Sequence, residues 1–238
     1  MLASAVQRIA SELPDDAVVL DVGGWAKPLA RADWVIDLLP YETRGLYGEA
    51  SAEPARFSAH TWVQRDICAR EPWPFADGQF DFAVCAHTLE DVRDPVWVGQ
   101  ELARVARAGY VEVPAPVEEL TWGVQGPWVG WGHHHWICER DGDELVFTFK
   151  PHLLCAEGRH LPAGTTQGLA PEELVVALWW ERELRVRERV FVGADEFDPW
   201  LAGLLGRNMP KTGKSAARPS ALRNLSARFP LRGRSARP

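Results

Sequence analysis

The fold is decided by the stretch Ala17-Val-Val-Leu-Asp-Val-Gly-Gly24, an unbroken run of β-forming residues that ends in two glycines. A strand without polar alternation is typical of a parallel sheet, because it is buried on both faces. Gly23 and Gly24 have no Cβ to block a ligand, and glycine adopts positive φ at little cost. We therefore predict a buried first strand, followed by a turn that a ligand can approach closely.

Outward from this stretch, short apolar runs alternate with helical segments. Further strands are predicted at residues 34–36, 61–64, 80–85 and 110–113. The helix predicted over residues 95–108 has apolar residues at spacings of three and four, and Gly109 is predicted as its C-cap. Strands that alternate with helices pair in parallel through right-handed crossovers. The sequence thus predicts an α/β fold, with a mostly parallel central sheet and helices on both faces.

The later part of the chain is less regular and predicts a C-terminal antiparallel addition. Residues 135–139 and 145–150 are predicted to form a hairpin, because the Asp-Gly between them favours a tight turn. A helix is predicted to begin at Pro171, with acids near the positive end of its dipole. Residues 183–192 are predicted to return as a final strand.

Charge is distributed unevenly along the chain. The net charge is −7, but nine Lys or Arg and no acid occur from Gly206 onward, which leaves −16 on residues 1–205. The basic segment is also poor in large apolar residues, so we predict a disordered tail over 206–238 after a single domain. That domain divides into a cofactor-binding half, 17–116, and a substrate-side half, 117–205. An acidic body repels phosphate backbones, so we expect no nucleic-acid partner.

The four cysteines form no CxxC pair, and the chain shows neither a signal peptide nor an apolar run suited to a membrane helix. We therefore expect reduced thiols, a cytoplasmic location and no membrane partner. The sequence leaves the oligomeric state open.

Polar residues gather where the predicted strands end, namely Asp21, Asp37, Asp66 and His87. Ligands of open parallel sheets bind beyond the carboxyl ends of the strands, near the reversal in strand order. Asp37 can accept hydrogen bonds from both hydroxyls of a ribose, and Asp66 can accept one from an adenine amine. Their order along the chain predicts a site for a nucleoside-containing cofactor.

Four segments resemble a known family: Val19-Leu-Asp-Val-Gly-Gly24, Trp62-Val-Gln-Arg-Asp-Ile67, the run from Pro74 to Val92, and Glu101-Leu-Ala-Arg-Val105. They are similar to the successive motifs of the class I S-adenosylmethionine-dependent methyltransferases, most of all to the group called methyltransferase type 11. The resemblance is good over residues 17–116 and looser to about 192. Residues 80–92 are its most specific part.

The resemblance implies a Rossmann-like methyltransferase fold and S-adenosylmethionine as the cofactor. It implies that Asp21, Gly23 and Gly24 hold the methionine end, that Asp37 holds the ribose, and that Asp66 with the adjacent Ile67 faces the adenine. The residue just past the fourth strand lies beside the methyl donor in this family, which implies His87.

The chain departs from the family pattern after the first strand. The usual third glycine is absent, since Trp25 and Ala26 follow Gly24. Only nine residues separate Gly24 from Trp34, so the helix that normally follows must be very short or missing. The contribution of a helix dipole to the cofactor site is correspondingly weaker.

A second cluster is rich in tryptophan and histidine and lies at residues 122–136. Three consecutive histidines on a strand cannot share one face, and Cys138 supplies no recognised zinc spacing, so no metal site is predicted. We interpret the cluster as a substrate cover, with Trp131, His133 and His135 as substrate residues, because aromatic faces and imidazoles suit a mixed apolar–polar ligand. Packing of some tryptophans in the core is the alternative.

The function predicted from these features is S-adenosylmethionine-dependent methylation of a small molecule, with a hydroxyl-bearing or sugar-like acceptor favoured. His87 is the candidate general base, because an imidazole titrates near neutral pH. A histidine merely hydrogen-bonded at a strand end is the alternative, and Glu90 and Asp91 are interpreted as caps of the following helix. A catalytically inactive binding module is the competing function, whereas a nicotinamide-dependent dehydrogenase would need the GxGxxG motif that this chain lacks.

Overall fold

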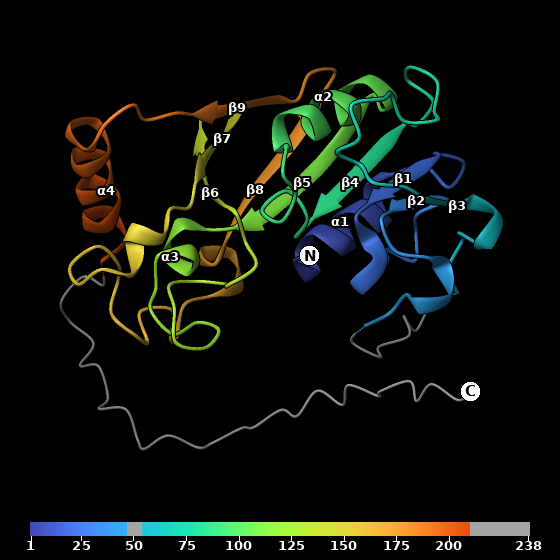
Figure 1. Ribbon diagram of the computed structural model, residues 1–238. Coiled ribbons are helices and arrows are strands. Elements are labelled where there is room, and N and C mark those ends of the chain that lie inside the picture. Colours follow the sequence, from blue (N-terminus) through green and yellow to red (C-terminus); the bar gives the residue numbers. More distant parts are fainter. Residues whose placement is uncertain (47–53, 210–238) are drawn as a thin grey trace, which may run out of the picture.

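The structure, a computed structural model, describes residues 1–46 and 54–209. Its centre is a six-stranded sheet in the order β3-β2-β1-β4-β5-β8 (Figure 1). Neighbouring strands from β1 to β5 are parallel, and β8 is antiparallel to β5. The predicted α/β fold with a mostly parallel sheet is confirmed. The strands are β1 (Val19–Val22), β2 (Trp34–Asp37), β3 (Trp62–Gln64), β4 (Phe82–Ala86), β5 (Ala108–Pro114) and β8 (Val175–Glu181).

Strand β1 lies inside the sheet, and all four of its residues are buried, including Asp21. It pairs with β2 on one side and with β4 on the other, so the strand order reverses beside it. Burial of each Val or Leu side chain of this kind contributes about 1.5–3 kcal/mol. The apolar run of the sequence therefore fixes β1 in the interior and its polar end at the edge where ligands bind in such sheets.

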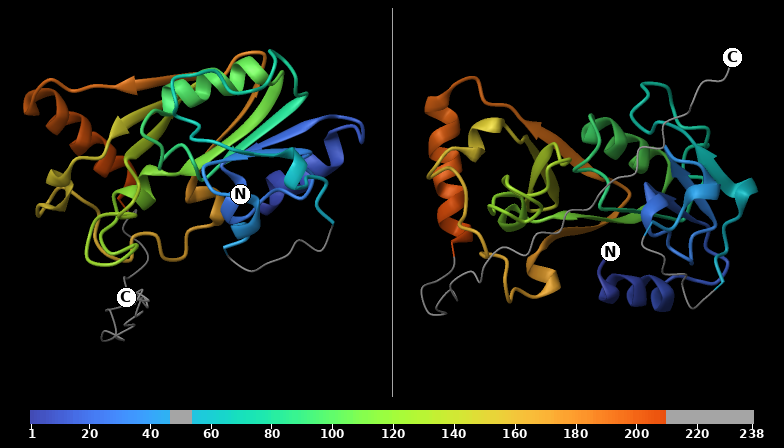
Figure 2. Two further views of the ribbon diagram at one scale, coloured as in Figure 1. Left: turned by 45° about the vertical axis from the view of Figure 1, so that its right-hand side comes forward. Right: turned by 60° about the horizontal axis from the view of Figure 1, so that its bottom comes forward.

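One helix covers each face of the sheet (Figure 2). Leu20 and Val22 point to the face covered by α2 (Pro95–Val105), whereas Val19 points to the face covered by α1 (Ala3–Glu12). Strand residues alternate between the two faces. The prediction of helices on both faces is confirmed.

A second, three-stranded sheet packs on the α2 side and consists of β6 (Trp136–Asp141), β7 (Glu144–Phe149) and β9 (Arg185–Arg189). Strands β6 and β7 form the predicted hairpin, and β9 pairs with β7 in parallel. Helix α2 approaches β9 closely at Gly99, where a Cβ would lie 2.6 Å from the Val186 side chain. The final strand therefore joins the second sheet and not the central one.

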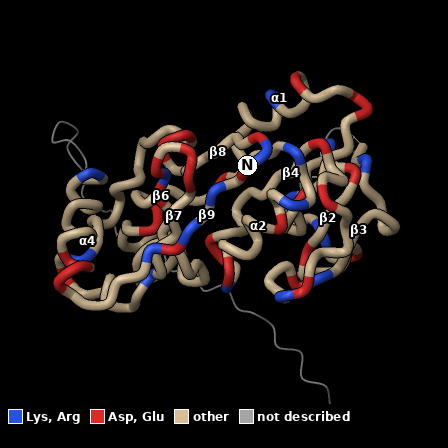
Figure 3. The backbone as a smooth tube through the Cα atoms, turned by 90° about the horizontal axis from the view of Figure 1, so that it is seen from above, with Lys and Arg blue, Asp and Glu red and all other residues tan. Residues whose placement is uncertain are grey.

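Ion pairs connect the strands of this second sheet. Arginines of β9 lie beside acids of β6 and β7 (Figure 3). Arg187 donates to Glu144 at 2.7 Å, and Arg189 pairs with the partly buried Glu139. The Arg187–Glu144 pair joins neighbouring strands, where opposite charges contribute to pairing, whereas the Arg189–Glu139 pair joins the two outer strands of the sheet.

The C-terminal helix α4 (Ala194–Asn208) packs on α3 (Pro116–Glu119) and on the start of β6. Helix α4 extends through Asn208, because Leu201 and Leu204 anchor its last turns in the core. The boundary predicted at residue 206 therefore falls inside a helix. Residues 210–238, most of the predicted basic tail, lie outside the described residues. Within the described residues, no helix is long and apolar enough to cross a membrane.

Two local predictions are wrong. Gly109 does not cap α2, which ends at Val105; it lies inside β5, where a Cβ would meet the Ala83 carbonyl oxygen at 2.4 Å and the Trp180 ring at 2.6 Å. The glycine serves close packing of the sheet. The helix predicted from Pro171 is one 3-10 turn, since the residues after it pair with β5 over the whole length of β8.

Candidate functional site

A cavity of about 990 Å³ opens at the carboxyl ends of β1, β2 and β4. This is the edge of the sheet beside the reversal in strand order, where ligands of open α/β sheets bind. The structure brings every predicted site residue to this one cavity. These are Asp21, Gly23, Gly24, Asp37, Asp66, Ile67, His87, Trp131, His133 and His135.

The turn after β1 is a single 3-10 turn, Gly24–Ala26, which confirms that the following helix is nearly absent. Gly23 has a φ of +75°, the left-handed region that favours glycine. A Cβ on Gly23 would lie 2.2 Å from Thr88 Oγ1, and one on Gly24 would lie 2.3 Å from Asp21 Oδ2. Thr88 and Asp21 therefore occupy the space that a Cβ on these glycines would need. The sequence suggested instead that this space is open to a ligand.

Asp21 and Asp37 are buried carboxylates at the ends of neighbouring strands. Burial raises the pKa of Asp21 to about 7, although the Leu29 N–H donates to it at 2.8 Å. Burial also raises the pKa of Asp37, against hydrogen bonds from the backbone N–H groups of Leu39 and Trp25. Burial has removed the water that would stabilise both carboxylates. A cationic or hydrogen-bond-donating ligand would replace that stabilisation, so both side chains favour such a ligand.

Asp66 lies at the rim and is already paired. Its Oδ2 accepts a hydrogen bond from Arg93 at 2.7 Å, and its Oδ1 accepts one from the Cys68 N–H at 2.9 Å. Partial desolvation would raise the pKa of Asp66, but these contacts outweigh it and lower the pKa. Asp66 is thus less available to an adenine amine than its place in the sequence indicates.

His87 follows β4 with a φ of +53°, and its backbone N–H donates to the Glu112 carbonyl of β5. Its Nε2 lies 2.9 Å from Glu112 Oε1, and its Nδ1 lies 3.7 Å from Glu90 Oε1. Burial would lower the pKa of His87, but the two carboxylates raise it to about 9. The ring is therefore cationic at neutral pH, a state in which it cannot accept a proton from an acceptor.

Glu112 is the fixed partner of this cation. Burial would raise its pKa, but hydrogen bonds from His87, the Leu2 N–H and the Tyr110 hydroxyl lower the pKa of Glu112 to about 2. Sequence reasoning did not single out Glu112. The sequence feature that could have indicated it is the single acid within the apolar run Tyr110-Val-Glu-Val113, because a glutamate buried in a strand needs a partner for its charge.

Glu90 and Asp91 were predicted to cap α2, and this prediction is wrong. Asp94 caps it, since its Oδ1 accepts from the Trp97 N–H at 2.9 Å. Glu90 is 1% exposed, and neither of its carboxylate oxygens has a hydrogen-bond partner among the described residues. Burial raises its pKa. Buried polar atoms are rarely left unpaired outside functional sites, so this carboxylate marks the cavity wall as a site.

The histidine run is not a strand, so the expectation drawn from strand alternation does not describe which of its rings meet. His133 and His134 meet edge to face with ring centroids 4.5 Å apart, and both lie near Asp91. The His134 side chain is only 7% exposed, and its Nδ1 is hydrogen-bonded to the buried Glu119. Sequence reasoning missed His134, because strand alternation does not apply to this loop.

Comparison with known proteins gives a family for part of the chain. Residues 34–111 match the sequence model of the family described as a methyltransferase domain. No curated protein matches the chain.

Several solved structures are similar over part of the chain. A putative methyltransferase from Bacillus halodurans C-125 is 20% identical over 48% of this chain and 51% of its own, with a TM-score of 0.35. A SAM-dependent methyltransferase from Aquifex aeolicus is 19% identical over 47% of this chain and 64% of its own, with a TM-score of 0.36. A structure of the Trm112 methyltransferase activator of Haloferax volcanii in complex with a putative methyltransferase is also similar. The identity is 17% over 47% of this chain and 51% of the other, with a TM-score of 0.35.

The matched regions of these three structures span 51–64% of their own lengths. Residues 34–111 build β2 to β5 of the parallel sheet. The chain is therefore similar to methyltransferase domains over the stretch that builds β2 to β5 of the parallel sheet.

Proposed function

We propose that this protein transfers the methyl group of S-adenosylmethionine to a small molecule bound in the cavity. The observation that carries the proposal is the placement of Asp21 and Asp37 at the ends of adjacent strands, around the Gly23 turn, in one cavity of about 990 Å³. That volume is at the upper end of the range for small-ligand sites and suits a nucleoside donor together with an acceptor.

The hydrogen-bonding capacity of Asp37 supports donor binding. A carboxylate offers about four lone-pair sites, and the backbone N–H groups of Trp25 and Leu39 use one on each oxygen. Each oxygen keeps a site, which matches the pair of hydroxyls on a ribose. The two backbone donors also hold the carboxylate in a fixed orientation.

The charge of the cavity supports a cationic donor. Its lining holds more acids than Lys and Arg, and acidic clefts concentrate cations. When bound, S-adenosylmethionine supplies a sulfonium methyl group, which passes to the acceptor as the acceptor's proton leaves to solvent and S-adenosylhomocysteine remains. The acidic lining residues are Asp21, Asp37, Asp66, Glu90, Asp91 and Glu118, and the basic ones are Lys27 and Arg93.

For the acceptor we propose a hydroxyl-bearing or sugar-like molecule held under the loop that carries Trp131 and His133. The rings of these two residues contact edge to face, and Trp131 donates to Glu118, which leaves aromatic surface and polar groups together at the cavity. His87 orients the acceptor as a cation, because its raised pKa makes it a poor base at neutral pH.

We further propose that the protein acts in the cytoplasm, without a nucleic-acid or membrane partner. All four cysteines are free thiols, three of them buried, which fits a reducing compartment. The acidic charge of residues 1–205 disfavours phosphate backbones.

A binding module without catalysis is the second candidate, favoured by the single 3-10 turn that replaces the helix after β1. The loss of that helix removes N–H donors and a positive dipole end from the donor site. A module of this kind would bind a ligand in the same cavity and transfer no methyl group.

The two candidates differ in donor binding and in product formation. Calorimetric titration with S-adenosylmethionine is expected to give about micromolar affinity, a binding free energy near −8 kcal/mol. Incubation with isotope-labelled donor and a metabolite pool is expected to yield a labelled product by mass spectrometry. Donor binding without any labelled product supports the module, and the absence of donor binding overturns the proposal.

A further inference from the structure

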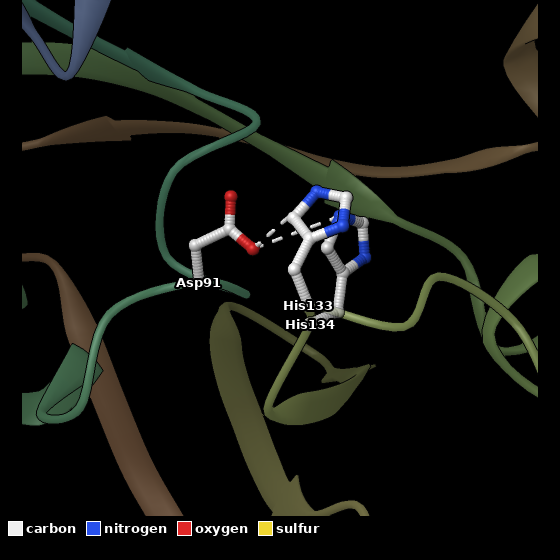
Figure 4. Close-up of side chains that lie close together, drawn as sticks. All are labelled: Asp91, His133 and His134. Carbon is white, nitrogen blue, oxygen red and sulfur yellow. Dashed lines mark ion pairs between the residues drawn. The ribbon is translucent and has the colours of Figure 1, made fainter. Parts of the chain in front are cut away.

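We propose that Asp91, His133 and His134 form a binding site for a divalent transition-metal ion of the zinc class at the wall of the cavity (Figure 4). One ligand atom from each residue lies within 4.8 Å of the other two. Asp91 Oδ1 is 3.9 Å from His133 Nε2 and 3.8 Å from His134 Nε2. Two imidazoles and one carboxylate are a ligand set that zinc and similar ions prefer over magnesium or calcium.

The spacing of these atoms suits an ion better than direct hydrogen bonds. N···O distances of 3.8 and 3.9 Å are too long for hydrogen bonds. Zinc bonds of about 2.0–2.1 Å place neighbouring ligand atoms of a tetrahedron about 3.4 Å apart. The two distances to Asp91 therefore need to contract by about 0.5 Å, and the distance between the two imidazole nitrogens, which lies within 4.8 Å, by at most about 1.4 Å. Rotations of the Asp91 and His133 side chains supply such movements.

An unpaired oxygen at the centre of the cluster is the second, independent observation. Asp91 Oδ1, the atom that faces both imidazoles, is buried and accepts no hydrogen bond from the described residues. Leaving a buried acceptor unpaired costs about 1–3 kcal/mol, and more for a charged group. A cation at the centre of the three ligand atoms would satisfy this oxygen.

Residues behind the cluster orient His134 in the way that metal-binding histidines are commonly oriented. His134 Nδ1 is hydrogen-bonded to the fully buried Glu119, whose other oxygen accepts from Lys150 Nζ at 2.7 Å. The Trp131 ring stacks on the imidazole with centroids 5.7 Å apart. A carboxylate on one ring nitrogen fixes the tautomer and directs the other nitrogen, here Nε2, toward the ion.

The two segments that supply the ligands are also tied to each other. The His135 N–H donates to the Glu90 carbonyl at 2.7 Å, and Trp136 Nε1 donates to the Val92 carbonyl at 2.7 Å. These bonds flank Asp91 on one segment and adjoin the histidines on the other. The ligands are therefore held close before any ion binds, which lowers the entropy cost of assembling the site.

Three protein ligands leave a fourth position for water or a substrate atom, as in catalytic zinc sites. All three ligands line the same cavity as the turn after β1, so that position is available to an acceptor hydroxyl. This use of the ion rests on the proposed methyl transfer. Metal binding does not, so its test stands apart from any test of donor binding.

The test uses tag-free full-length protein, stripped with chelator and titrated with Zn²⁺, then with Co²⁺ while the visible absorption of the cobalt is recorded. One ion per chain is expected to bind at micromolar concentration or below, with a tetrahedral cobalt spectrum, and Mg²⁺ is expected not to compete. Asp91→Asn, His133→Ala and His134→Ala should each weaken Zn²⁺ binding at least tenfold. Glu119→Gln, behind His134, should weaken it by about 10–100-fold.

His135→Ala is the matched control, because it removes a histidine from the same run but no ligand from the cluster. Zn²⁺ affinity in this variant should stay within twofold of the unsubstituted chain. His133 is exposed, so His133→Ala should fold normally, and its melting temperature checks that it does. Adventitious binding to a histidine run would respond equally to His135→Ala and not at all to Asp91→Asn. That outcome, or an absence of stoichiometric binding, overturns the proposal.

Discussion

Two imidazole–glutamate pairs lie on the walls of the same cavity, and they differ in what surrounds the carboxylate that the second ring nitrogen faces. His87 places Nε2 on Glu112 and Nδ1 near Glu90, so acids flank both nitrogens. His134 places Nδ1 on Glu119, while its Nε2 faces Asp91 across 3.8 Å. In both rings the second nitrogen therefore faces a further carboxylate at a similar distance, but only the carboxylate beside His134 also faces a second imidazole, that of His133.

The buried glutamates differ as well. Glu119 is shared between His134 and Lys150, so it keeps a cation if the histidine is removed. Glu112 pairs with His87 at 2.9 Å and with the N-terminal ammonium of Met1 at 3.4 Å, a longer contact than the one between Glu119 and Lys150. Two motifs with the same residue types therefore serve different ends: one fixes a cation beside the proposed methyl donor, and the other positions a ligand atom.

The largest expected effect separates the two pairs by stability. His87→Ala leaves the buried Glu112 carboxylate with the more distant Met1 ammonium as its remaining cation. Removing one member of a fully buried ion pair costs about 3–5 kcal/mol, and the cost is smaller here because His87 is partly exposed and a second cation remains. We expect a loss of roughly 2 kcal/mol in the free energy of unfolding, measured by urea denaturation. His134→Ala should cost about 1 kcal/mol, near the value of a single hydrogen bond, because Lys150 still pairs with Glu119. Equal losses in the two variants would remove the distinction between the pairs.

The next effect concerns donor affinity at the strand ends. Asp37→Ala removes a buried, oriented acceptor and should weaken S-adenosylmethionine binding by one to two decades, since a hydrogen bond to a charged group contributes roughly 1.5–3 kcal/mol. Asp66→Ala should weaken it less than tenfold, because Asp66 is exposed and already engaged by Arg93. Calorimetry measures both, with Asp143→Ala in the β6–β7 turn as the control. Unchanged binding in Asp37→Ala would contradict the donor site.

The pH dependence of turnover tests the state of His87. If the cation orients the acceptor, turnover falls as pH rises through about 9, by about tenfold one unit above that value, because the cationic fraction then falls to about a tenth. A general base would give the opposite sign, with turnover rising toward pH 9. The His87→Gln variant, which keeps a hydrogen-bonding group without titrating, should show neither trend in this range.

Stability should follow the same group with a defined sign. The folded-state pKa of His87, about 9, lies above its ordinary value of 6.5. The stabilisation is therefore complete below pH 6.5 and is lost as pH rises through about 9. Urea denaturation between pH 6 and about 10 should show this decline in the unsubstituted chain and a flatter profile in His87→Gln. The same decline in both would assign it to another group.

The sequence predicted the framework of this cavity better than its walls. Strands β1 to β5 were predictable because each is a short apolar run, and their polar ends converge because parallel strands end at one edge. The Glu112–His87 pair was not predictable, since it depends on which residue of β5 stands beside the end of β4. A helix was predicted to begin at Pro171, just before the edge strand β8, because only the pairing of β8 with β5 overrides the proline and acids that precede the strand.

Local chemistry also misled where the backbone is irregular. Strand alternation selected His133 and His135, but the loop turns His134 inward to Glu119 and brings His133 beside it. The glycine turn was expected to make room for a ligand, and that room holds Thr88 and Asp21. Glu119 beside His134 and Thr88 beside Gly23 are both distant in sequence, so no local pattern encodes these two contacts.

The smallest expected effect is that of deleting residues 210–238. Every described residue that lines the cavity precedes Trp136, so both the donor site and the metal cluster are complete without that segment. A cut after residue 209 also keeps α4 whole, including the pair between Arg207 and Glu139, which a cut at 206 would remove. Donor and Zn²⁺ affinities should stay within twofold, and the melting temperature should change by less than about 2 °C, because the deleted segment has too few apolar residues to contribute a core. The opposite outcome is that the truncation lowers the melting temperature by several degrees and that high salt removes this difference from the full-length chain. It would mean that the eight cations of residues 210–238 stabilise the acidic domain electrostatically.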